Sequence, residues 1–167
     1  VCVDMEHSPF DRGRADACLA MARALDFPVL VRVTHFSSET ILQALDMGAV
    51  GVIAPHIINA NQAADLVKLS HFGNGGRGFA GATRWAGYGQ KTMAEVLAQS
   101  DRETVVIAQI EEPEALANVE EIASIEGIDG LFLGPSDMSV SMGHSNTNSQ
   151  ELLDALKRVG EASLAAG

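Results

Sequence analysis

Ionisable or strongly polar residues stand at the end of each of five short apolar segments in this chain of 167 residues. In folds built on parallel strands, the carboxyl ends of the strands share one edge of the sheet, and catalytic groups gather there. Polar residues at five successive strand ends are hard to explain as surface decoration, so they define a candidate active site. In chain order these residues are Asp4, Glu6 and His7, then Arg32, His56, Gln109 and Glu111, and finally Ser136 and Asp137.

Glu111 and Asp137 are the pair best suited to hold a metal ion. Alternation along a strand at 105–111 puts Gln109 and Glu111 on one face and sends Glu112 to the other. Two carboxylates with open positions around them suit a hard divalent cation such as Mg²⁺ or Mn²⁺. The alternative is that Glu111 and Glu112 only open the next helix, where the dipole favours acids, and that Asp137 belongs to a plain turn. This alternative is preferred for Glu112 and stays open for Glu111.

His7 is a candidate general base, because an unperturbed imidazole titrates at about pH 6.5. A turn histidine bonded to the backbone is the simpler interpretation of one isolated histidine. Asp46 stands near the end of a predicted helix, where the dipole disfavours an acid. Asp46 is therefore either a solvated surface acid or an acid held by a specific partner, for which His7 is the candidate.

Arg32 lies within an apolar strand, where a guanidinium is costly unless it is paired. Such a group binds a substrate carboxylate or stabilises a developing enolate, whereas an ion pair with Asp4 or Glu6 is the alternative that stays open. The glycine-rich segment 73–89 has no regular period and is predicted to be a long loop. Long loops in compact domains tend to be functional, but this one lacks the GxGxxG pattern of a dinucleotide site.

The elements that must position these residues alternate between short apolar strands and longer amphipathic helices. Apolar strands without polar alternation are typical of a parallel sheet covered by helices, so the fold class is α/β. Ser37 or Ser38 caps one helix, Asn59 or Asn61 caps the next, and Gly48 marks a helix end. The predicted strands are 1–6, 28–33, 50–54, 104–110 and 130–133. The predicted helices are about 11–25, 113–125 and 149–165, together with one that carries Ile41, Leu42 and Leu45 and one that carries Ala63, Leu66, Val67 and Leu69.

Two architectures fit this pattern, a doubly wound open sheet and a (β/α)8 barrel. Five strands suffice for the first, whereas a barrel needs eight strands and typically ~250 residues, so length alone favours the open sheet. The composition, 47% apolar and 20% charged, is that of an ordinary globular domain. The net charge of −11 argues against binding to nucleic acid or to an anionic membrane surface.

Cys2 and Cys18 form no CxxC pair, so neither a disulfide framework nor a zinc cluster is predicted. A reducing, cytoplasmic location is the plain expectation. No apolar run approaches the ~20 residues of a membrane span, and no signal peptide is recognised.

Six motifs, taken together and in order, resemble the HpcH/HpaI family of class II 2-oxo-acid aldolases. They are DMEHSPFD, VLVRV, QALDMGAVGVIAP, GGRGFAGATRWAGYG, AQIEE and GLFLGPSDMS. The resemblance implies a (β/α)8 TIM barrel of the phosphoenolpyruvate/pyruvate type, present here as about five strand–helix units. Residues 1–167 would then form a single incomplete barrel domain that lacks the first strand unit and the last two, either as a fragment or as a truncated chain. Open parallel edges predict poor solubility or a need for partner chains.

The resemblance assigns roles to the candidate residues. His7 becomes the catalytic base, Arg32 the stabiliser of the pyruvate enolate and a substrate contact, and Asp46 the acid that raises the basicity of His7. In the same way, Gln109 becomes a substrate contact, Glu111 and Asp137 the metal ligands, and the backbone around Ser136 and Asp137 the binder of the pyruvate carboxylate.

The activity implied by the resemblance is the cleavage of a 4-hydroxy-2-oxo acid to pyruvate and an aldehyde through an enolate that a divalent metal ion (Mg²⁺, Mn²⁺ or Co²⁺) stabilises. Partners would be these small molecules and further copies of the chain, because full-length family members tend to form hexamers. Two alternatives stay open. One is a malyl- or citramalyl-CoA-type lyase of the same superfamily, and the other is a non-catalytic, flavodoxin-like binding module.

Overall fold

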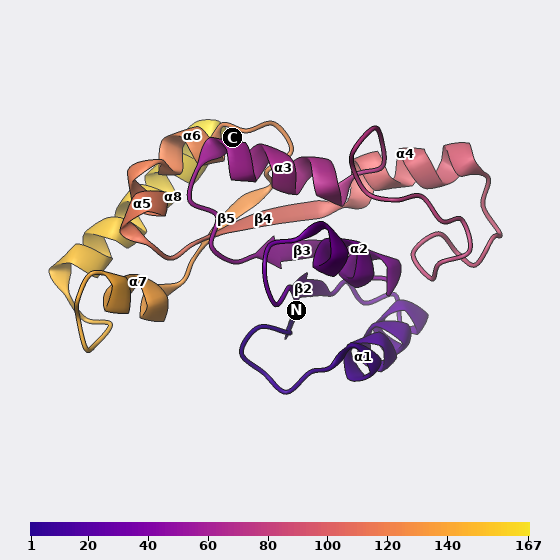
Figure 1. The fold of residues 1–167 in the computed structure, drawn as a ribbon, viewed down its shortest axis with the longest axis horizontal. Coiled ribbons are helices and arrows are strands. Elements are labelled where there is room, and N and C mark those ends of the chain that lie inside the picture. Colours follow the sequence, from indigo (N-terminus) through magenta and orange to yellow (C-terminus); the bar gives the residue numbers. More distant parts are fainter.

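A computed structural model describes residues 1–167 as one parallel sheet of five strands with helices beside it (Figure 1). The strands are β1 (Cys2–Asp4), β2 (Leu30–Arg32), β3 (Gly51–Ala54), β4 (Val105–Ile110) and β5 (Gly130–Leu133). The helices are α1 (Arg12–Ala24), α2 (Ser38–Asp46), α3 (Ala60–Ser70), α4 (Met93–Glu103), α5 (Pro113–Ala117), α6 (Val119–Ala123), α7 (Pro135–Ser141) and α8 (Gln150–Ala166).

The strands are hydrogen-bonded in the order β1-β2-β3-β4-β5, so spatial order follows chain order. A doubly wound sheet reverses its order at a switch point, whereas a (β/α) barrel adds each strand beside the previous one. The helices also form one row, because α2 packs on α3, α3 on α6 and α6 on α8. The prediction of a partial barrel is confirmed, and the open-sheet interpretation, together with the flavodoxin-like module, is wrong.

The two faces of the sheet have different contents. Val31, Val52 and Val106 are paired across β2, β3 and β4 and are fully buried in the main apolar core, which the helices cover. The alternate row contains Asp4 and Arg32, which are register partners on β1 and β2. Strand alternation therefore directs these two charged residues to the face opposite the helices, which is the inside of a barrel.

Capping residues in the sequence predicted most of the helix starts correctly. The side chains of Ser37 and Asn59 accept hydrogen bonds from the backbone of Thr40 and Gln62, as expected of N-caps. Gly48, after α2, adopts a φ of 107°, which a residue with a side chain rarely adopts. The strands are confirmed in place, although four of the five are shorter than predicted.

Three helical features differ from the prediction. The helix expected over 113–125 is broken at Asn118 into α5 and α6, because Asn118 leaves helical geometry and its amide donates to the carbonyl of Ile58. Helix α4 and helix α7 were not predicted. The GPSD segment, expected as a possible turn, instead begins α7, with Pro135 in the first turn.

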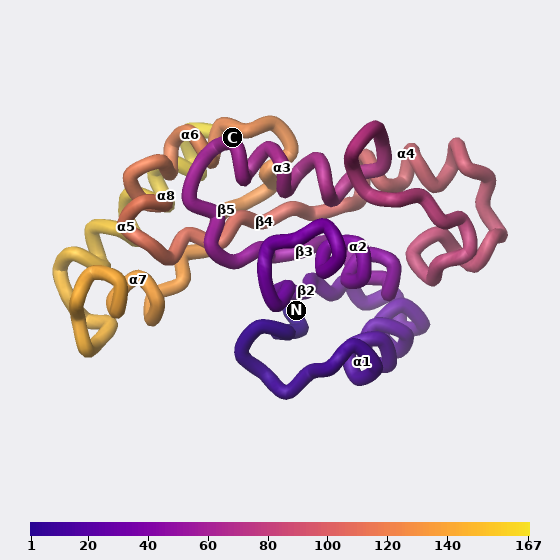
Figure 2. Tube along the Cα trace, viewed as in Figure 1, coloured from indigo at the N-terminus to yellow at the C-terminus, as the bar shows by residue number.

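Figure 2 shows the path of the chain from β1, at one edge of the sheet, to α8, which runs back along α6. The long glycine-rich loop and α4 lie beyond the start of β4, at the opposite end of the molecule from α5 and α7 (Figure 1). None of the helices is both long enough and apolar enough to cross a lipid bilayer.

Candidate active site

Arg32 and Asp4 form the first element of the site, at the carboxyl ends of β2 and β1. Arg32 donates from Nε to Asp4 Oδ1 at 2.9 Å and from Nη2 to Asp4 Oδ2 at 2.6 Å. This paired geometry lowers the pKa of Asp4 to about 2, chiefly through the hydrogen bond from Arg32, and raises the pKa of Arg32. The guanidinium is thus fixed and charged, and the pairing with Asp4 that sequence left open is observed.

Glu6 lies on the other side of Arg32 and is short of hydrogen-bond donors. Its Oε2 is 3.4 Å from Arg32 Nη1, and its side chain is only 9% exposed. Oε2 is buried and accepts no hydrogen bond. Burial, followed by the negative charge of Glu111, raises the pKa of Glu6 above its ordinary value.

Glu111, which follows β4, is the most deeply buried acid of the site, with 1% of its side chain exposed. Its carboxylate accepts the backbone N–H of His56 at 2.8 Å and a hydrogen bond from Nε2 of Gln109. Gly134, just after β5, packs so closely that a Cβ there would lie 2.8 Å from Glu111 Oε2. Three neighbouring strand ends therefore hold one carboxylate in place.

Gln109 is completely buried, and its Oε1 has no hydrogen-bond partner. Its observed contact is with Glu111, so the amide orients that carboxylate. The substrate contact implied for Gln109 stays a prediction.

His56 completes the cluster from the end of β3. Its Nδ1 is 2.9 Å from Glu112 Oε1 and 3.2 Å from Glu111 Oε1, while its Nε2 is 3.8 Å from Glu6 Oε1. Burial lowers the pKa of His56, but the carboxylates of Glu111 and Glu112 outweigh burial and raise this pKa overall.

The residues present fit a divalent cation. One donor atom from each of Glu6, His56 and Glu111 lies within 4.8 Å of the other two. Arg32 is paired with Asp4, and the carboxylates of Glu6, Glu111 and Glu112 lie around His56. The cluster therefore carries an excess of negative charge that a cation would offset.

The second predicted metal ligand, Asp137, lies half-buried in the first turn of α7, three residues after Gly134. Ser136 is exposed in the same turn. Because Gly134 contacts Glu111, the start of α7 belongs to the same edge of the sheet. Joint binding of a metal by Glu111 and Asp137, and of a carboxylate by the backbone at Ser136, remain predictions.

His7 lies at this edge too, and 59% of its side chain is exposed. Its Nε2 is 3.7 Å from Glu6 Oε2, and its backbone N–H donates to Asp4 at 3.3 Å. The ring is therefore free to meet a substrate, which is what a general base requires.

Asp46 is not part of this cluster. Helix α2 starts after β2 and returns to the amino edge of the sheet, so Asp46, its last residue, precedes β3 and lies at the opposite end from His7. Its carboxylate is bound instead by Nη2 of Arg77 at 2.5 Å. The expected partnership of Asp46 with His7 does not form within this chain, and the specific partner is an arginine of the glycine-rich loop.

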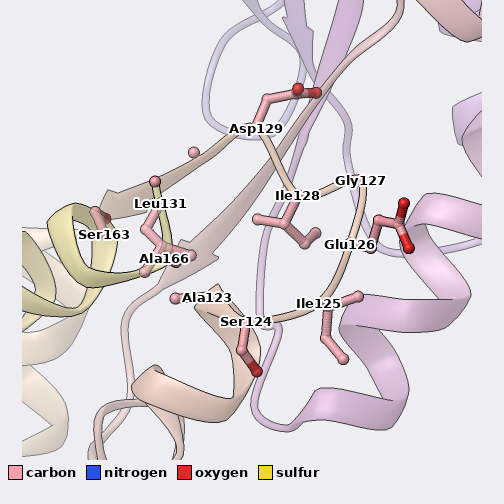
Figure 3. A pocket seen from close by; sticks show the side chains of 12 residues that line it. Ala123, Ser124, Ile125, Glu126, Gly127, Ile128, Asp129, Leu131, Ser163 and Ala166 are labelled. Carbon is pink, nitrogen blue, oxygen red and sulfur yellow. The ribbon is translucent and has the colours of Figure 1, made fainter.

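An open pocket lies at the amino edge as well, between the segment that leads into β5 and the end of α8 (Figure 3). Ile125, Ile128 and Leu131 line it together with Ser163 and Ala166. None of the predicted site residues lines this pocket, so it is separate from the acidic cluster.

The entire chain, residues 1–167, matches the family model described as HpcH/HpaI aldolase/citrate lyase. The chain belongs to this family. A hydroxypyruvate/pyruvate aldolase from Rhizorhabdus wittichii is 36% identical, over 100% of this chain and 66% of the relative. A 4-hydroxy-2-oxovalerate aldolase from Rhodococcus jostii is 35% identical, over 99% of this chain and 66% of the relative. The resemblance found in the sequence motifs is confirmed.

Solved structures agree with this HpcH/HpaI assignment. The crystal structure of a HpcH/HpaI aldolase/citrate lyase family protein from Burkholderia cenocepacia superposes with a TM-score of 0.90 at 33% identity, and the match covers 99% of this chain and 66% of that chain. The chain thus spans about two thirds of the length of these relatives.

His56 is the residue of this HpcH/HpaI site that the sequence placed at a strand end without giving it a function. The sequence placed it after the third strand, but its spacing from other histidines matches no metal motif, and no role was assigned to it. Its position at a strand end was the available signal, since the other four strand ends supply the rest of the cluster.

Proposed function

We propose that the protein is a divalent-metal-dependent aldolase that cleaves a 4-hydroxy-2-oxo acid to pyruvate and an aldehyde. The observation that carries the proposal is the buried carboxylate of Glu111, held by Gln109 and the backbone of His56 at the same edge of the sheet as the fixed guanidinium of Arg32. The names of the two aldolase relatives, which refer to pyruvate, hydroxypyruvate and a 4-hydroxy-2-oxo acid, support this substrate class.

The proposed roles follow from what each side chain can reach. Arg32 keeps its positive charge because Asp4 binds two of its nitrogens, and it offsets negative charge that develops on the 2-oxo acid. His7, exposed and close to Glu6, moves the proton of the 4-hydroxyl group as the aldol bond breaks or forms. Glu111 and Asp137 hold the divalent ion, which supplies Lewis-acid polarisation of the 2-oxo group when bound. Asp46 does not contact the substrate in this proposal; it supports the fold by binding Arg77 of the glycine-rich loop.

The decisive assay measures pyruvate released from 4-hydroxy-2-oxo acids, with Mg²⁺, Mn²⁺ or Co²⁺ added and with excess chelator. Glu111→Gln removes the charge but keeps the shape, and we expect it to abolish cleavage and divalent-ion binding together. Glu121→Gln, an exposed acid on α6, is the matched control and should behave like the unmodified protein. Full activity in excess chelator would contradict the metal dependence, and cleavage of malyl- or citramalyl-CoA in place of the free acids would favour the thioester lyase.

Two further expectations belong to this proposal. We propose that the protein forms a homo-oligomer, as the family resemblance implies. Analytical ultracentrifugation would measure its oligomeric state. The reducing, cytoplasmic compartment stays a prediction based on the two free cysteines, Cys2 and Cys18.

A further inference from the structure

His56 has a backbone conformation that needs a reason. Its φ is 57°, in the left-handed region that non-glycine residues seldom occupy. Such strain is retained where the surrounding structure imposes it, and it clusters at functional sites. Here the conformation turns the backbone N–H of His56 onto Glu111 while the ring also stays beside the acidic cluster.

The ring of His56 is oriented by a second carboxylate. Nδ1 is 2.9 Å from Glu112 Oε1, and because a carboxylate only accepts hydrogen bonds, the neutral ring with its proton on Nδ1 carries its lone pair on Nε2. A carboxylate that holds the far nitrogen of a histidine is the usual support of an imidazole metal ligand. Nε2 is 3.8 Å from Glu6 Oε1, less than twice the ~2.1 Å distance at which such ligands bind, so both atoms can reach one ion.

Two buried oxygens of the cluster still lack partners. Glu6 Oε2 accepts no hydrogen bond although only 9% of the side chain is exposed, and Gln109 Oε1 has no partner in a fully buried side chain. Buried polar atoms are normally satisfied. The nearest charged groups to Glu6 Oε2 are Arg32 Nη1 at 3.4 Å and His7 Nε2 at 3.7 Å, and neither forms a hydrogen bond with it, so a cation bound beside Glu6 and Glu111 would supply the contact that this carboxylate lacks. Glu6, His56 and Glu111 come from the ends of β1, β3 and β4, which are rigid supports.

We propose that His56 is itself a ligand, through Nε2, of the divalent ion assigned above to Glu111 and Asp137, with Glu6 as a further oxygen ligand and Glu112 as the residue that positions the ring. This inference rests on the proposed function, because it concerns the same ion. An imidazole donor shifts preference from Mg²⁺ toward borderline ions such as Co²⁺, Ni²⁺ or Zn²⁺. The chain would therefore select a transition-metal ion.

The direct test detects nitrogen bound to the metal. Electron spin-echo spectroscopy of the Mn²⁺-loaded protein is expected to show ¹⁴N modulation from a bound imidazole. The modulation should vanish in His56→Met and in His56→Gly, the second of which also suits the left-handed backbone and so guards against misfolding. It should persist in His7→Asn, the control for the histidine that lies 3.7 Å from Glu6.

Calorimetric titration gives an independent measure. His56→Met should weaken Co²⁺ binding at least about tenfold, while Mg²⁺ binding changes much less. The ligand assignment is overturned if the ¹⁴N modulation survives in both His56 variants, or if the unmodified protein binds Mn²⁺ without modulation. Neither outcome would contradict the proposed aldolase activity. A protein that binds Mn²⁺ through His56 but releases no pyruvate would keep the assignment and refute the proposed function, and a protein that binds no divalent ion refutes both.

Discussion

The substitution Asp46→Ala tests whether Asp46 stabilises the fold through its ion pair with Arg77. The Arg77 side chain is completely buried, and its Nε and Nη1 have no hydrogen-bond partners, so Asp46 is its single ionic partner. The guanidinium lies over Phe72 at 4.5 Å and over Trp85 at 5.0 Å, which favours a cation but does not replace a counter-ion. Burial holds the pKa of Arg77 below its ordinary value despite the Asp46 carboxylate.

The expected cost follows from this burial. Removing one partner of a buried ion pair costs about 3–5 kcal/mol. Asp46 is 26% exposed, so water enters part of the gap, and we expect the lower value, about 3 kcal/mol. For a domain of this size each kcal/mol shifts the melting temperature by roughly 2–4 °C, so the Asp46→Ala protein should melt about 6–12 °C lower.

The assay is a double-mutant cycle followed by thermal and urea melts. Arg77→Met replaces the guanidinium with an apolar chain that can pack against the rings of Phe72 and Trp85, so Asp46→Ala combined with Arg77→Met should recover most of the lost stability. Asp65→Ala, on the exposed face of α3, is the control and should change stability by at most about 0.5 kcal/mol.

Pyruvate release by the double variant separates the two roles of Asp46. If both stability and cleavage recover, Asp46 acts by holding the glycine-rich loop. If stability recovers but cleavage does not, Asp46 has the chemical role that the family resemblance implies, which is to raise the basicity of His7. The reasoning is refuted if Asp46→Ala melts within about 2 °C of the unmodified protein, or if the two substitutions destabilise additively.

Three further predictions concern the carboxyl edge. The pKa of Asp4 is lowered to about 2, so its pairing stabilises the fold fully above its ordinary value near 4 and is lost as the pH falls toward 2; Asp4→Asn should flatten this part of the pH dependence in urea melts. Gly134→Ala should weaken divalent-ion binding about tenfold in calorimetry, because its Cβ would displace the Glu111 carboxylate 2.8 Å away, whereas Gly130→Ala, whose nearest neighbour is 3.9 Å away, should not. Arg32→Lys keeps the charge but not the paired contact with Asp4, so kcat/KM should fall about a hundredfold, and an unchanged value would contradict the assigned role.

The sequence predicted the elements whose signals are local. Apolar runs identified the five strands, and the caps at Ser37 and Asn59 identified helix starts, because both depend on neighbouring residues alone. The break at Asn118 was not predictable in this way, since it depends on a hydrogen bond to Ile58, sixty positions away. Helix α4 did carry a readable signal, the capping box of Thr92 and Glu95, which the sequence analysis did not use.

The site was predictable to the extent that strand ends meet at one edge. That rule brought Asp4, Arg32, His56 and Glu111 together, and the structure adds the contacts of His56 with Glu111 and Glu112. The contacts that tune the cluster, such as the bond from the His56 backbone to Glu111, depend on a left-handed residue that no periodicity reveals. The placement of Asp46, by contrast, follows from topology, because a helix that leaves the carboxyl edge must end at the amino edge.

The same topology explains the contacts of the glycine-rich loop, 73–89, which meets residues at the amino edge of the sheet. Arg77 binds Asp46, and Arg84 binds both carboxylate oxygens of Asp16 and the carbonyl of Met47, so two arginines fasten the loop to α1 and to the end of α2. In barrels the carboxyl edge carries the chemistry, and specific contacts at the amino edge serve stability. The loop is thus fixed at the amino edge through Arg77 and Arg84, whereas the acidic cluster of Glu6, His56 and Glu111 lies at the carboxyl edge.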